Sequence, residues 1–215
     1  MLIWNQAVDV FRAAIFAYSQ ACGGNLGLGI VMVTFLARAI MFPLSLRLAR
    51  ATIAHRELMK KLKPELDRLR ERFKNQPERL NQEAHRIFKR EGASPVPLKG
   101  CVGNLVQMPV LFALFEAVRQ SVRPGGACFW IGNIAKPDFL LATVVAAITC
   151  ATAALGTGST DQPHTIFIVL PTVLTFFFLL RMSAGVGLYW GTSSLFGLIQ
   201  SVILRRERVA AERVS

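Results

Sequence analysis

The stretch LGLGIVMVTFLARAIMFPLSL, residues 26–46, decides the fold because its 21 residues include a single ionisable side chain, Arg38. At about 1.5 Å per residue such a helix is about 31 Å long, enough to cross the hydrocarbon core of a bilayer. A charge near the middle of a span costs at least about 2.5–3.5 kcal/mol, so we expect Arg38 to face water or a partner. The alternative is that its long side chain snorkels towards the interface near Arg47, about 13 Å further along the helix.

The whole chain has 215 residues, of which 53% are hydrophobic, yet its formal net charge is +12. Long apolar runs combined with strong basicity are typical of a multi-pass membrane protein. The four cysteines, at positions 22, 101, 128 and 150, form no CxxC pair, so the sequence suggests neither zinc nor thioredoxin chemistry. We expect no metal site and no bound cofactor. A disulfide between Cys22 and Cys128 is conceivable, but the sequence favours free thiols.

Residues 1–25 are predicted to form an amphipathic helix that lies along the membrane surface and ends at Gly23-Gly24-Asn25. One helical stripe is apolar and the other side is polar. The apolar stripe contains Ile3, Ala7, Val10, Phe11, Ala14, Ile15 and Tyr18, and the polar side contains Asn5, Asp9, Arg12 and Ser19. A membrane-spanning helix is the rival interpretation, but it would place Asp9 and Arg12 deep in lipid.

Residues 47–98 differ sharply in composition and are predicted to form an antiparallel helical hairpin in water. Residues 47–99 hold fifteen Lys or Arg and seven Asp or Glu. A narrow apolar seam at spacings of mostly three and four runs through both arms and indicates a coiled coil. Its members are Leu58, Leu62, Leu66, Leu69 and Phe73 before the break at Asn75-Gln76-Pro77, and Leu80, Ala84, Ile87 and Phe88 after it. Pro64 is expected to kink or restart the first arm.

Four further apolar stretches complete a predicted bundle of five transmembrane helices, which makes the fold class an all-α membrane protein. These stretches are residues 99–118, 139–155, 165–181 and 184–204. Their connections are predicted as an outer loop over residues 119–138, a cytoplasmic loop over residues 156–164 and a cytoplasmic tail over residues 205–215. The third and fourth spans are short for a hydrocarbon core, which implies local thinning of the bilayer.

The distribution of basic residues predicts the orientation of the five spans. Nineteen Lys or Arg of the hairpin and the tail fall on one side of the membrane, and five fall on the other side. Because basic residues favour the cytoplasmic side, we expect the hairpin and the C-terminus in the cytoplasm and the N-terminus outside. Trp130 would then lie at the outer interface, where indoles are favoured.

Five blocks of the sequence carry a resemblance to a known family when they are taken together. They are VTFLARAIMFPLS (33–45), LKPELDRLRERF (62–73), PLKGCVGNLVQMPVLFALFEAV (97–118), FWIGNIAKPDFL (129–140) and LPTVLTFFFLLRMSAGVGLYW (170–190). In this order and at similar spacing they resemble the YidC-type membrane protein insertases, a family shared with the oxidase-assembly insertases of mitochondria. The chain looks like a short form of that family without a large periplasmic domain.

The resemblance implies a five-helix core around a hydrophilic groove that opens to the cytoplasm and to lipid and is closed towards the outside. In that family the groove arginine occupies the position of Arg38, and a threonine one turn earlier matches Thr34. Aromatic residues of the last span match Tyr189 and Trp190. Gln107, in the third block, is expected to face the same groove.

Each of these residues also has a plain structural interpretation. Thr34 could donate to the carbonyl one turn back, as membrane threonines often do. Gln107 could join two helices by a hydrogen bond, and Tyr189 and Trp190 could belong to an interfacial aromatic belt. Glu116 is expected to be solvated or paired with an arginine rather than to relay protons.

The implied activity has a clear physical basis. Inserting a single-span protein means moving a hydrophilic tail across about 30 Å of hydrocarbon. A groove lined by Arg38, Thr34 and Gln107 would keep part of that path hydrated, and its positive charge would attract acidic residues of the tail. Partitioning of the apolar segment into lipid then drives the reaction, and the sequence has no GxxxxGK[ST] phosphate loop. The expected protein is an insertase and chaperone of the bacterial cytoplasmic (inner) membrane, and not an enzyme.

The main alternative is a small channel or transporter subunit. Against it, only one span carries a mid-membrane charge and no inverted repeat is visible. An intramembrane protease is disfavoured because the chain has no GxSxG or HExxH motif. The expected partners are nascent membrane-protein clients, anionic lipids and, through the basic hairpin, a ribosome, a targeting receptor or a translocon. We expect a monomer without a specific nucleic-acid partner.

Overall fold

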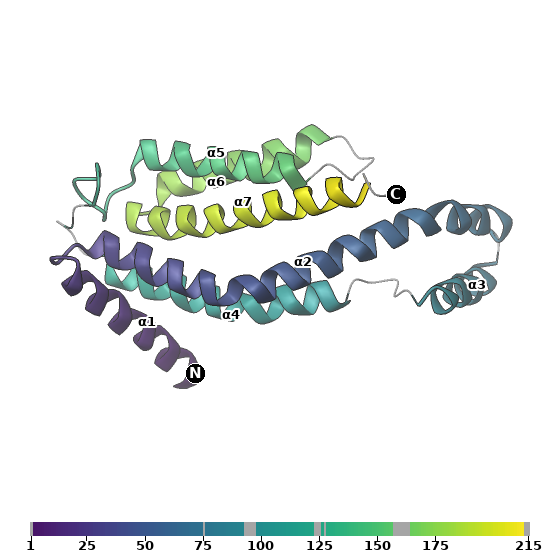
Figure 1. Ribbon diagram of the computed structural model, residues 1–215, viewed down its shortest axis with the longest axis horizontal. Helices are drawn as coiled ribbons and strands as arrows, with labels where there is room; N and C mark the ends of the chain where they lie inside the picture. The colour runs from purple at the N-terminus through teal and green to yellow at the C-terminus, as the bar shows by residue number, and fades with distance from the viewer. Residues whose placement is uncertain are drawn as a thin grey trace. The chain divides into compact units, whose positions relative to one another are not determined.

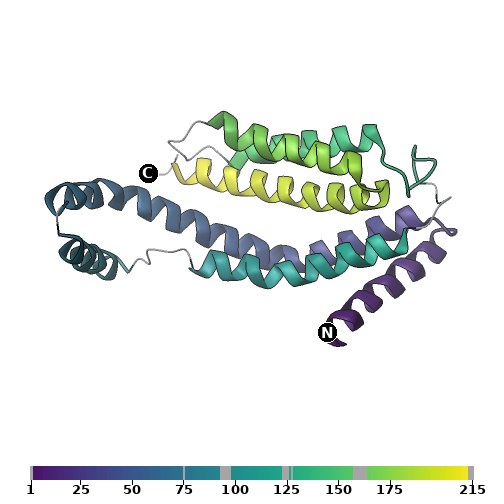
Figure 2. The same ribbon diagram turned by 180° about the vertical axis from the view of Figure 1, so that it is seen from behind.

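The computed structural model describes residues 2–74, 76–92, 98–122, 126, 128–156 and 164–212. Over these residues the chain forms seven helices and one isolated bridge between Cys128 and Ile131 (Figure 1, Figure 2). The helices are α1 (Leu2–Ala21), α2 (Leu26–Arg72), α3 (Pro77–Arg90), α4 (Leu98–Ser121), α5 (Phe139–Gly156), α6 (His164–Arg181) and α7 (Ala184–Glu212).

The chain divides into two compact units, which we describe separately. The bundle unit comprises Met1–Phe42 and Pro109–Ser215, and the arm unit comprises Pro43–Met108. The boundaries fall inside α2 and α4, so each of these two helices contributes one part to the bundle unit and one part to the arm unit.

The core of the bundle unit collects apolar side chains from all of its helices and from the loop that precedes α5. Helix α5 packs along both α6 and α7 (Figure 1). Gly187 permits the close approach of α7, because a Cβ atom there would lie 2.7 Å from Cδ2 of Leu141 in α5. The largest fully buried side chains are Ile15, Ile30, Leu114, Ile134, Val118, Val145, Val186, Thr34 and Cys128.

Helix α1 packs against the beginning of α2 through small residues. A Cβ atom at Gly29 would lie 2.5 Å from the carbonyl oxygen of Ile15, so a larger residue would force the two helices apart. Ser19 is buried in this contact although its position predicts the polar side of the helix. Conversely, Val10 belongs to the predicted apolar stripe but is exposed, as is Phe16. The close approach of the two backbones at Gly29 therefore places the small Ser19 in this contact, beside the buried Ile15.

The loop before α5 is fixed to the first turns of two helices. The Oδ1 atom of Asp138 accepts a hydrogen bond of 2.6 Å from the amide three residues on, in α5. The amides of Ala184 and Gly185, at the start of α7, donate to the carbonyls of Lys136 and Ile134 at 2.9 and 3.0 Å. The first amides of a helix have no partner within the helix, so these bonds satisfy them and hold the loop in place.

The arm unit contains the later part of α2 and the whole of α3. Arg90 of α3 pairs with Glu65 of α2 at 3.2 Å, and hydrogen bonds to Glu91 and Glu65 raise the pKa of the exposed Arg90 guanidinium. Among the described residues of this unit, Leu62 and Ile87 are the buried ones. The other members of the predicted apolar seam are half-buried, so the seam is the least exposed face of both helices.

Two helices continue beyond the points at which the sequence predicts a change. Helix α2 runs through Pro43 and Pro64 as one helix of 47 residues, so Pro64 does not restart the arm. Proline removes one backbone donor, and the bonds on either side keep the helix continuous. Helix α7 continues from the apolar span into the basic segment as far as Glu212. No glycine or proline interrupts residues 205–212, which explains why the helix does not stop.

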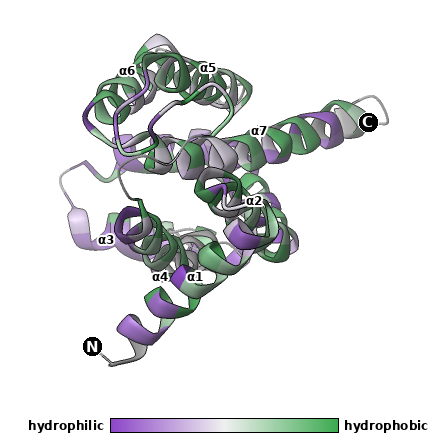
Figure 3. Ribbon diagram, turned by 90° about the vertical axis from the view of Figure 1, so that its left-hand side faces the viewer, coloured by the Kyte–Doolittle hydropathy of each residue, from purple (hydrophilic) through white to green (hydrophobic). Residues whose placement is uncertain are grey.

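Three helices are long and apolar enough to cross a membrane among the described residues. They are α2, α5 and the part of α7 over Ala184–Glu207, and the shorter apolar helix is Thr165–Arg181. Figure 3 shows α5 and α6 coloured as hydrophobic over most of their length and α3 as hydrophilic. The described residues therefore support a multi-span membrane protein, while the predicted count of five spans also needs α4, whose side chains over 98–107 lie outside the described ones.

Candidate functional site

The candidate site is built around Arg38, which projects from the packed side of α2. Met32, Leu36 and Ile40 recur every four residues and form an exposed apolar stripe, with Ile40 77% exposed. Residues two apart on a helix point in directions about 200° apart, so Arg38 points away from this stripe. The stripe suits lipid, whereas the Arg38 side chain is half-buried within the bundle unit.

Arg38 contacts α7 at a point flanked by two aromatic ring contacts between α2 and α7. Its Nε atom donates a hydrogen bond of 3.1 Å to the hydroxyl of Ser193. Phe35 and Phe42, one turn before and one turn after, both meet the ring of Phe196 edge-on, with centroids 5.3 and 5.9 Å apart. Among the described residues Arg38 has no carboxylate partner, and its two Nη atoms make no hydrogen bond. The near end of the guanidinium is therefore held while its far end keeps its donors free.

A chain of hydroxyl groups continues from Arg38 through α7 to α4. Ser193 and Tyr189 lie one turn apart on the same face of α7, so their side chains are neighbours. The Tyr189 hydroxyl donates to the carbonyl of Leu111 at 3.2 Å, and its ring meets Phe115 edge-on at 6.2 Å. A hydroxyl both donates and accepts, so the donors can run in one direction from Arg38 to Ser193 to Tyr189 to the carbonyl. This network joins three helices at the level of the arginine.

The other sequence-predicted residues lie at the edge of this network or outside it. Thr34 is fully buried, and its hydroxyl donates to the carbonyl of Ile30 at 2.7 Å, as its plain structural interpretation predicts. Trp190 is half-buried, and its ring centroid lies 5.3 Å from that of Phe178. The side chain of Gln107 lies outside the described residues. The structure thus brings Arg38 and Tyr189 together and leaves the placement of Gln107 open.

Ser193 is not among the site residues predicted from the sequence, although it lies between two of them, Arg38 and Tyr189. A signal is present, because Ser193 follows Tyr189 by four residues and therefore lies on the same helix face. It also belongs to the only run of three hydroxyl residues in the last apolar stretch, Thr192-Ser193-Ser194. The pairing with Arg38 itself depends on the register between α2 and α7, which the sequence of either helix alone does not fix.

Two further groups of polar residues are not part of this site. Glu116 pairs with Arg119 at 2.8 Å and accepts a hydrogen bond from Gln120, so the expectation of an arginine-paired carboxylate is confirmed. Cys22, Cys128 and Cys150 are free thiols. Within the described ranges no three or more His, Cys, Asp or Glu side chains are grouped so that they could hold a metal ion.

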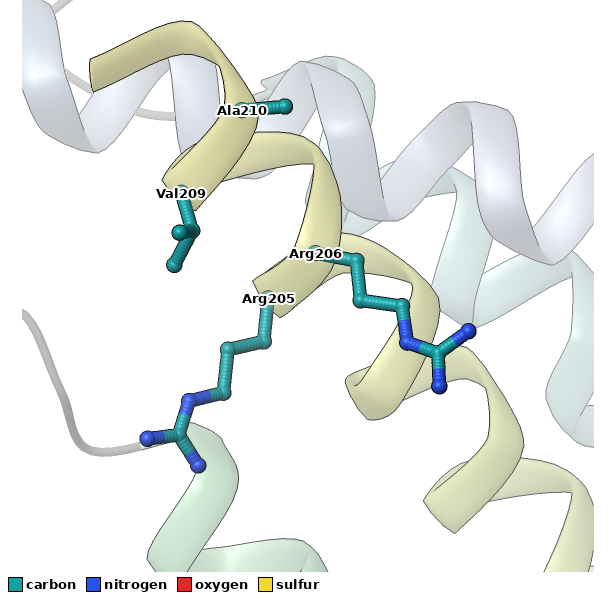
Figure 4. A pocket seen from close by; sticks show the side chains of 4 residues that line it. All are labelled: Arg205, Arg206, Val209 and Ala210. Carbon is teal, nitrogen blue, oxygen red and sulfur yellow. The ribbon is translucent and has the colours of Figure 1, made fainter. Parts of the chain in front are cut away.

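A hollow of about 350 Å³ lies near the end of α7 and is separate from the Arg38 site. It is lined by Arg205, Arg206, Val209 and Ala210 (Figure 4). Figure 4 shows the two arginine side chains extending from the helix in different directions. Twelve residues, about 18 Å of helix, separate Ser193 from Arg205, so this basic end of α7 does not belong to the Arg38 network.

Comparison with known proteins gives consistent matches over nearly the whole chain. Residues 17–212 match the family described as "60Kd inner membrane protein". A protein of Fusobacterium nucleatum named membrane protein insertase YidC is 32% identical over 200 residues, which cover 92% of this chain and 94% of that protein. Membrane protein insertase YidC 1 of Halalkalibacterium halodurans is 30% identical over 204 residues, which cover 92% of this chain and 77% of that protein.

A solved structure shows the same fold. It is described as the crystal structure of an active YidC insertase with the first transmembrane domain resolved, and it superposes with a TM-score of 0.59 at 23% sequence identity. The match covers 89% of this chain and 45% of the solved chain, so this chain spans less than half of that protein. The likeness supports the helical arrangement of the core.

Proposed function

The chain belongs to the family of YidC-type membrane protein insertases, and from that premise we propose that Arg38 is the client-facing charge of a hydrated groove within the membrane. In this proposal a short hydrophilic segment of the client enters the groove, and its transmembrane segment then moves sideways into lipid. Relatives named as insertases favour this function over the alternative of a small channel or transporter subunit. Partitioning of the apolar segment drives the transfer, without bond-making chemistry.

The depth of Arg38 in its span and the lack of a carboxylate partner among the described residues support this proposal. It lies about 18 Å along α2 from Leu26, near the middle of a span, and it points away from the exposed apolar stripe. A charge at this depth is costly unless water or an opposite charge solvates it. No carboxylate among the described residues does so, and the Nη atoms make no hydrogen bond there. A guanidinium with free donors can bind a carboxylate in bidentate geometry, which suits the acidic residues of a client tail.

We assign supporting roles to the other residues of the site according to their burial. Ser193 holds the near end of the Arg38 guanidinium by a hydrogen bond, and Tyr189, one turn earlier on α7, supports Ser193. Thr34 is fully buried one turn earlier and supports the same stretch of α2. Trp190 and Gln107 are proposed to line the groove, since a half-buried indole and an amide suit a boundary between water and lipid.

The orientation and the partners belong to the same proposal. The relatives are YidC proteins of bacteria, and the family description names an inner membrane protein. We propose five spans, with the N-terminus outside and the arm unit and C-terminus in the cytoplasm, as the basic residues predict. The clients would be nascent membrane proteins, and the basic arm would receive a ribosome, a targeting receptor, a translocon or anionic lipid. The protein would act as a monomer.

Photo-crosslinking to a stalled client tests the groove. A crosslinking amino acid replaces Trp190 or Gln107, and a matched probe replaces Ile40 on the exposed stripe of α2. We expect the acidic tail of a ribosome-bound single-span client to be crosslinked from positions 190 and 107 and not from position 40. Adducts between the tail and position 40 at equal or higher yield would contradict the groove.

A further inference from the structure

The segment 128–131 forms a two-residue hairpin with two aromatic residues at its tip. Cys128 and Ile131 exchange both backbone hydrogen bonds, each 2.9 Å long, and Phe129 and Trp130 occupy the turn. Phe129 has φ of 51°, in the left-handed region. In two-residue hairpins this position is usually taken by glycine, because a side chain is strained there. A bulky aromatic ring at such a position points to a role for the ring itself.

The base of the hairpin is fixed in the core of the bundle unit. Cys128 and Ile131 are both buried, and a Cβ atom at Gly27 of α2 would overlap the side chain of Cys128. The indole Nε1 of Trp130 donates to Asp138 at 3.4 Å, and the same carboxylate oxygen accepts an amide of the first turn of α5. The tip therefore has a defined position relative to the beginning of α5.

The two rings themselves are open to the surroundings. Phe129 is 66% exposed and Trp130 is 54% exposed, with ring centroids 6.1 Å apart. The next helix begins with Phe139 and Leu140, which are 68% and 53% exposed, and this helix is one of the candidate membrane spans. An exposed aromatic pair thus adjoins the end of an apolar helix whose own first residues are exposed and apolar.

We propose that Phe129 and Trp130 form an anchor that inserts into the interfacial layer of the bilayer at the end where α5 begins. The partner of these two rings is therefore the lipid of the bilayer surface. An indole ring, with an apolar body and a polar N–H group, is favoured at this layer, and the Asp138 carboxylate accepts that N–H. Continuity with the exposed apolar start of a span argues for lipid, because a span ends where the interfacial layer begins.

The anchor would fix how deeply this end of the bundle unit sits. Helix α5 has 18 residues, about 27 Å of helix, which is shorter than a typical hydrocarbon core of about 30 Å. An anchor at one end of a short span holds that end at the interface, so the mismatch is taken up by thinning of the bilayer or at the other end. The anchor lies outside the Arg38 network and does not require a function for Arg38.

Depth-dependent fluorescence quenching in vesicles tests this proposal on the full chain. The protein has three tryptophans, so Trp4→Phe with Trp190→Phe leaves Trp130 as the single indole. The chain is reconstituted in phosphatidylcholine brominated either near the headgroup, at carbons 6 and 7, or deeper, at carbons 11 and 12. We expect stronger quenching by the shallow bromines and weak quenching by aqueous acrylamide. A chain in which all three native tryptophans are replaced and Ile40→Trp supplies the single indole serves as the reference for a deep position.

A second variant separates the ring from the backbone conformation. Phe129→Asn keeps a residue that tolerates left-handed φ, so the hairpin should fold, but it removes the apolar ring. We expect this variant to keep the melting temperature of the parent in detergent and to lose part of the shallow quenching of Trp130. Full access of Trp130 to acrylamide would overturn the anchor. So would protection from both quenchers, which would indicate a protein contact, or unchanged quenching in Phe129→Asn.

Discussion

The bundle unit and the arm unit share α2 and α4 but are stabilised in different ways. In the bundle unit, side chains such as Leu114, Val118 and Val186 are completely buried, while large apolar side chains such as Ile40 remain exposed. In the described part of the arm unit, burial is limited to Leu62 and Ile87. The ion pairs of the arm are exposed ones, such as Arg86 with Glu83 and Arg90 with Glu65.

This difference is visible within α2, whose first part suits a lipid environment and whose later part suits water. In α2 the residues before Phe42 are apolar on the outside and carry a single guanidinium on the inside, as suits lipid. The residues after it expose charges and keep a narrow apolar seam, as suits water. The bundle therefore depends on packing, whereas the charges of the arm contribute little to its stability and are available for partners.

A core truncation tests the dependence of the bundle on packing and should have the largest effect. Leu114→Ala removes a fully buried side chain of α4. Because the surrounding helices cannot collapse onto the cavity, we expect a loss of about 2–5 kcal/mol in the free energy of unfolding. Thermal denaturation in detergent measures it. A melting temperature equal to that of the parent would show that packing around α4 is not what stabilises the bundle.

Deletion of residues 57–91 tests whether the arm is needed for the fold or for delivery. If the arm serves delivery, the protease-resistant bundle should remain with an unchanged melting temperature. Without electrostatic attraction, client delivery at low salt should slow by about tenfold or more. Raising the salt concentration should slow the parent and leave the deletion variant unaffected, since salt screens exposed charges. Loss of the protease-resistant bundle would contradict the independence of the two units.

The hydroxyl network of the bundle is tested by Ser193→Ala with Ser194→Ala as its matched control. Ser193 accepts the Nε–H of Arg38, so its removal leaves the guanidinium without the contact that holds its near end. We expect Ser193→Ala to lower the insertion of clients with acidic tails, by less than the loss of Arg38 itself, and Ser194→Ala to insert at the parental rate. Equal rates for the two variants would remove Ser193 from the site.

The smallest effect is expected from the ion pair of the arm. Glu65→Ala removes the carboxylate that pairs with Arg90, and both side chains are substantially exposed. Exposed ion pairs contribute little to stability because water screens both charges, so the helical content of the arm should change little. Circular dichroism and limited proteolysis of the arm measure this. A large loss of helix in Glu65→Ala would mean that charges, and not the Leu62–Ile87 seam, hold the arm together.

Much of the fold follows from local patterns in the sequence. The 21-residue apolar stretch around Arg38 and the change to fifteen basic residues after it already separate a membrane part from an aqueous part. The break at Asn75-Gln76-Pro77 and the apolar seam with spacings of mostly three and four residues place two helices in the arm. These features can be read from the sequence because the pattern of apolar and charged residues along one helix sets which of its faces is buried.

The details that escaped prediction depend on contacts between helices. The burial of Ser19 follows from the close approach of α1 to Gly29, and the hydrogen bond of Arg38 to Ser193 follows from the register of α2 against α7. The left-handed Phe129 is likewise set by the hairpin that Cys128 and Ile131 anchor in the core. No periodicity within a single helix encodes these pairings. The groove roles of Gln107 and Trp190 stay predictions, whereas Thr34 is proposed as a buried support of α2.

In the proposed function, the Arg38 guanidinium provides a hydrated positive charge for client tails within the membrane. The most direct test measures insertion of one single-span client with either an acidic tail or the same tail with Asp replaced by Asn. We predict that Arg38→Ala lowers insertion of the acidic-tailed client by about tenfold, equivalent to about 1.4 kcal/mol, with a much smaller effect on the neutral tail. Arg38→Lys should largely preserve both. Unchanged insertion of the acidic-tailed client by Arg38→Ala would contradict this role of Arg38.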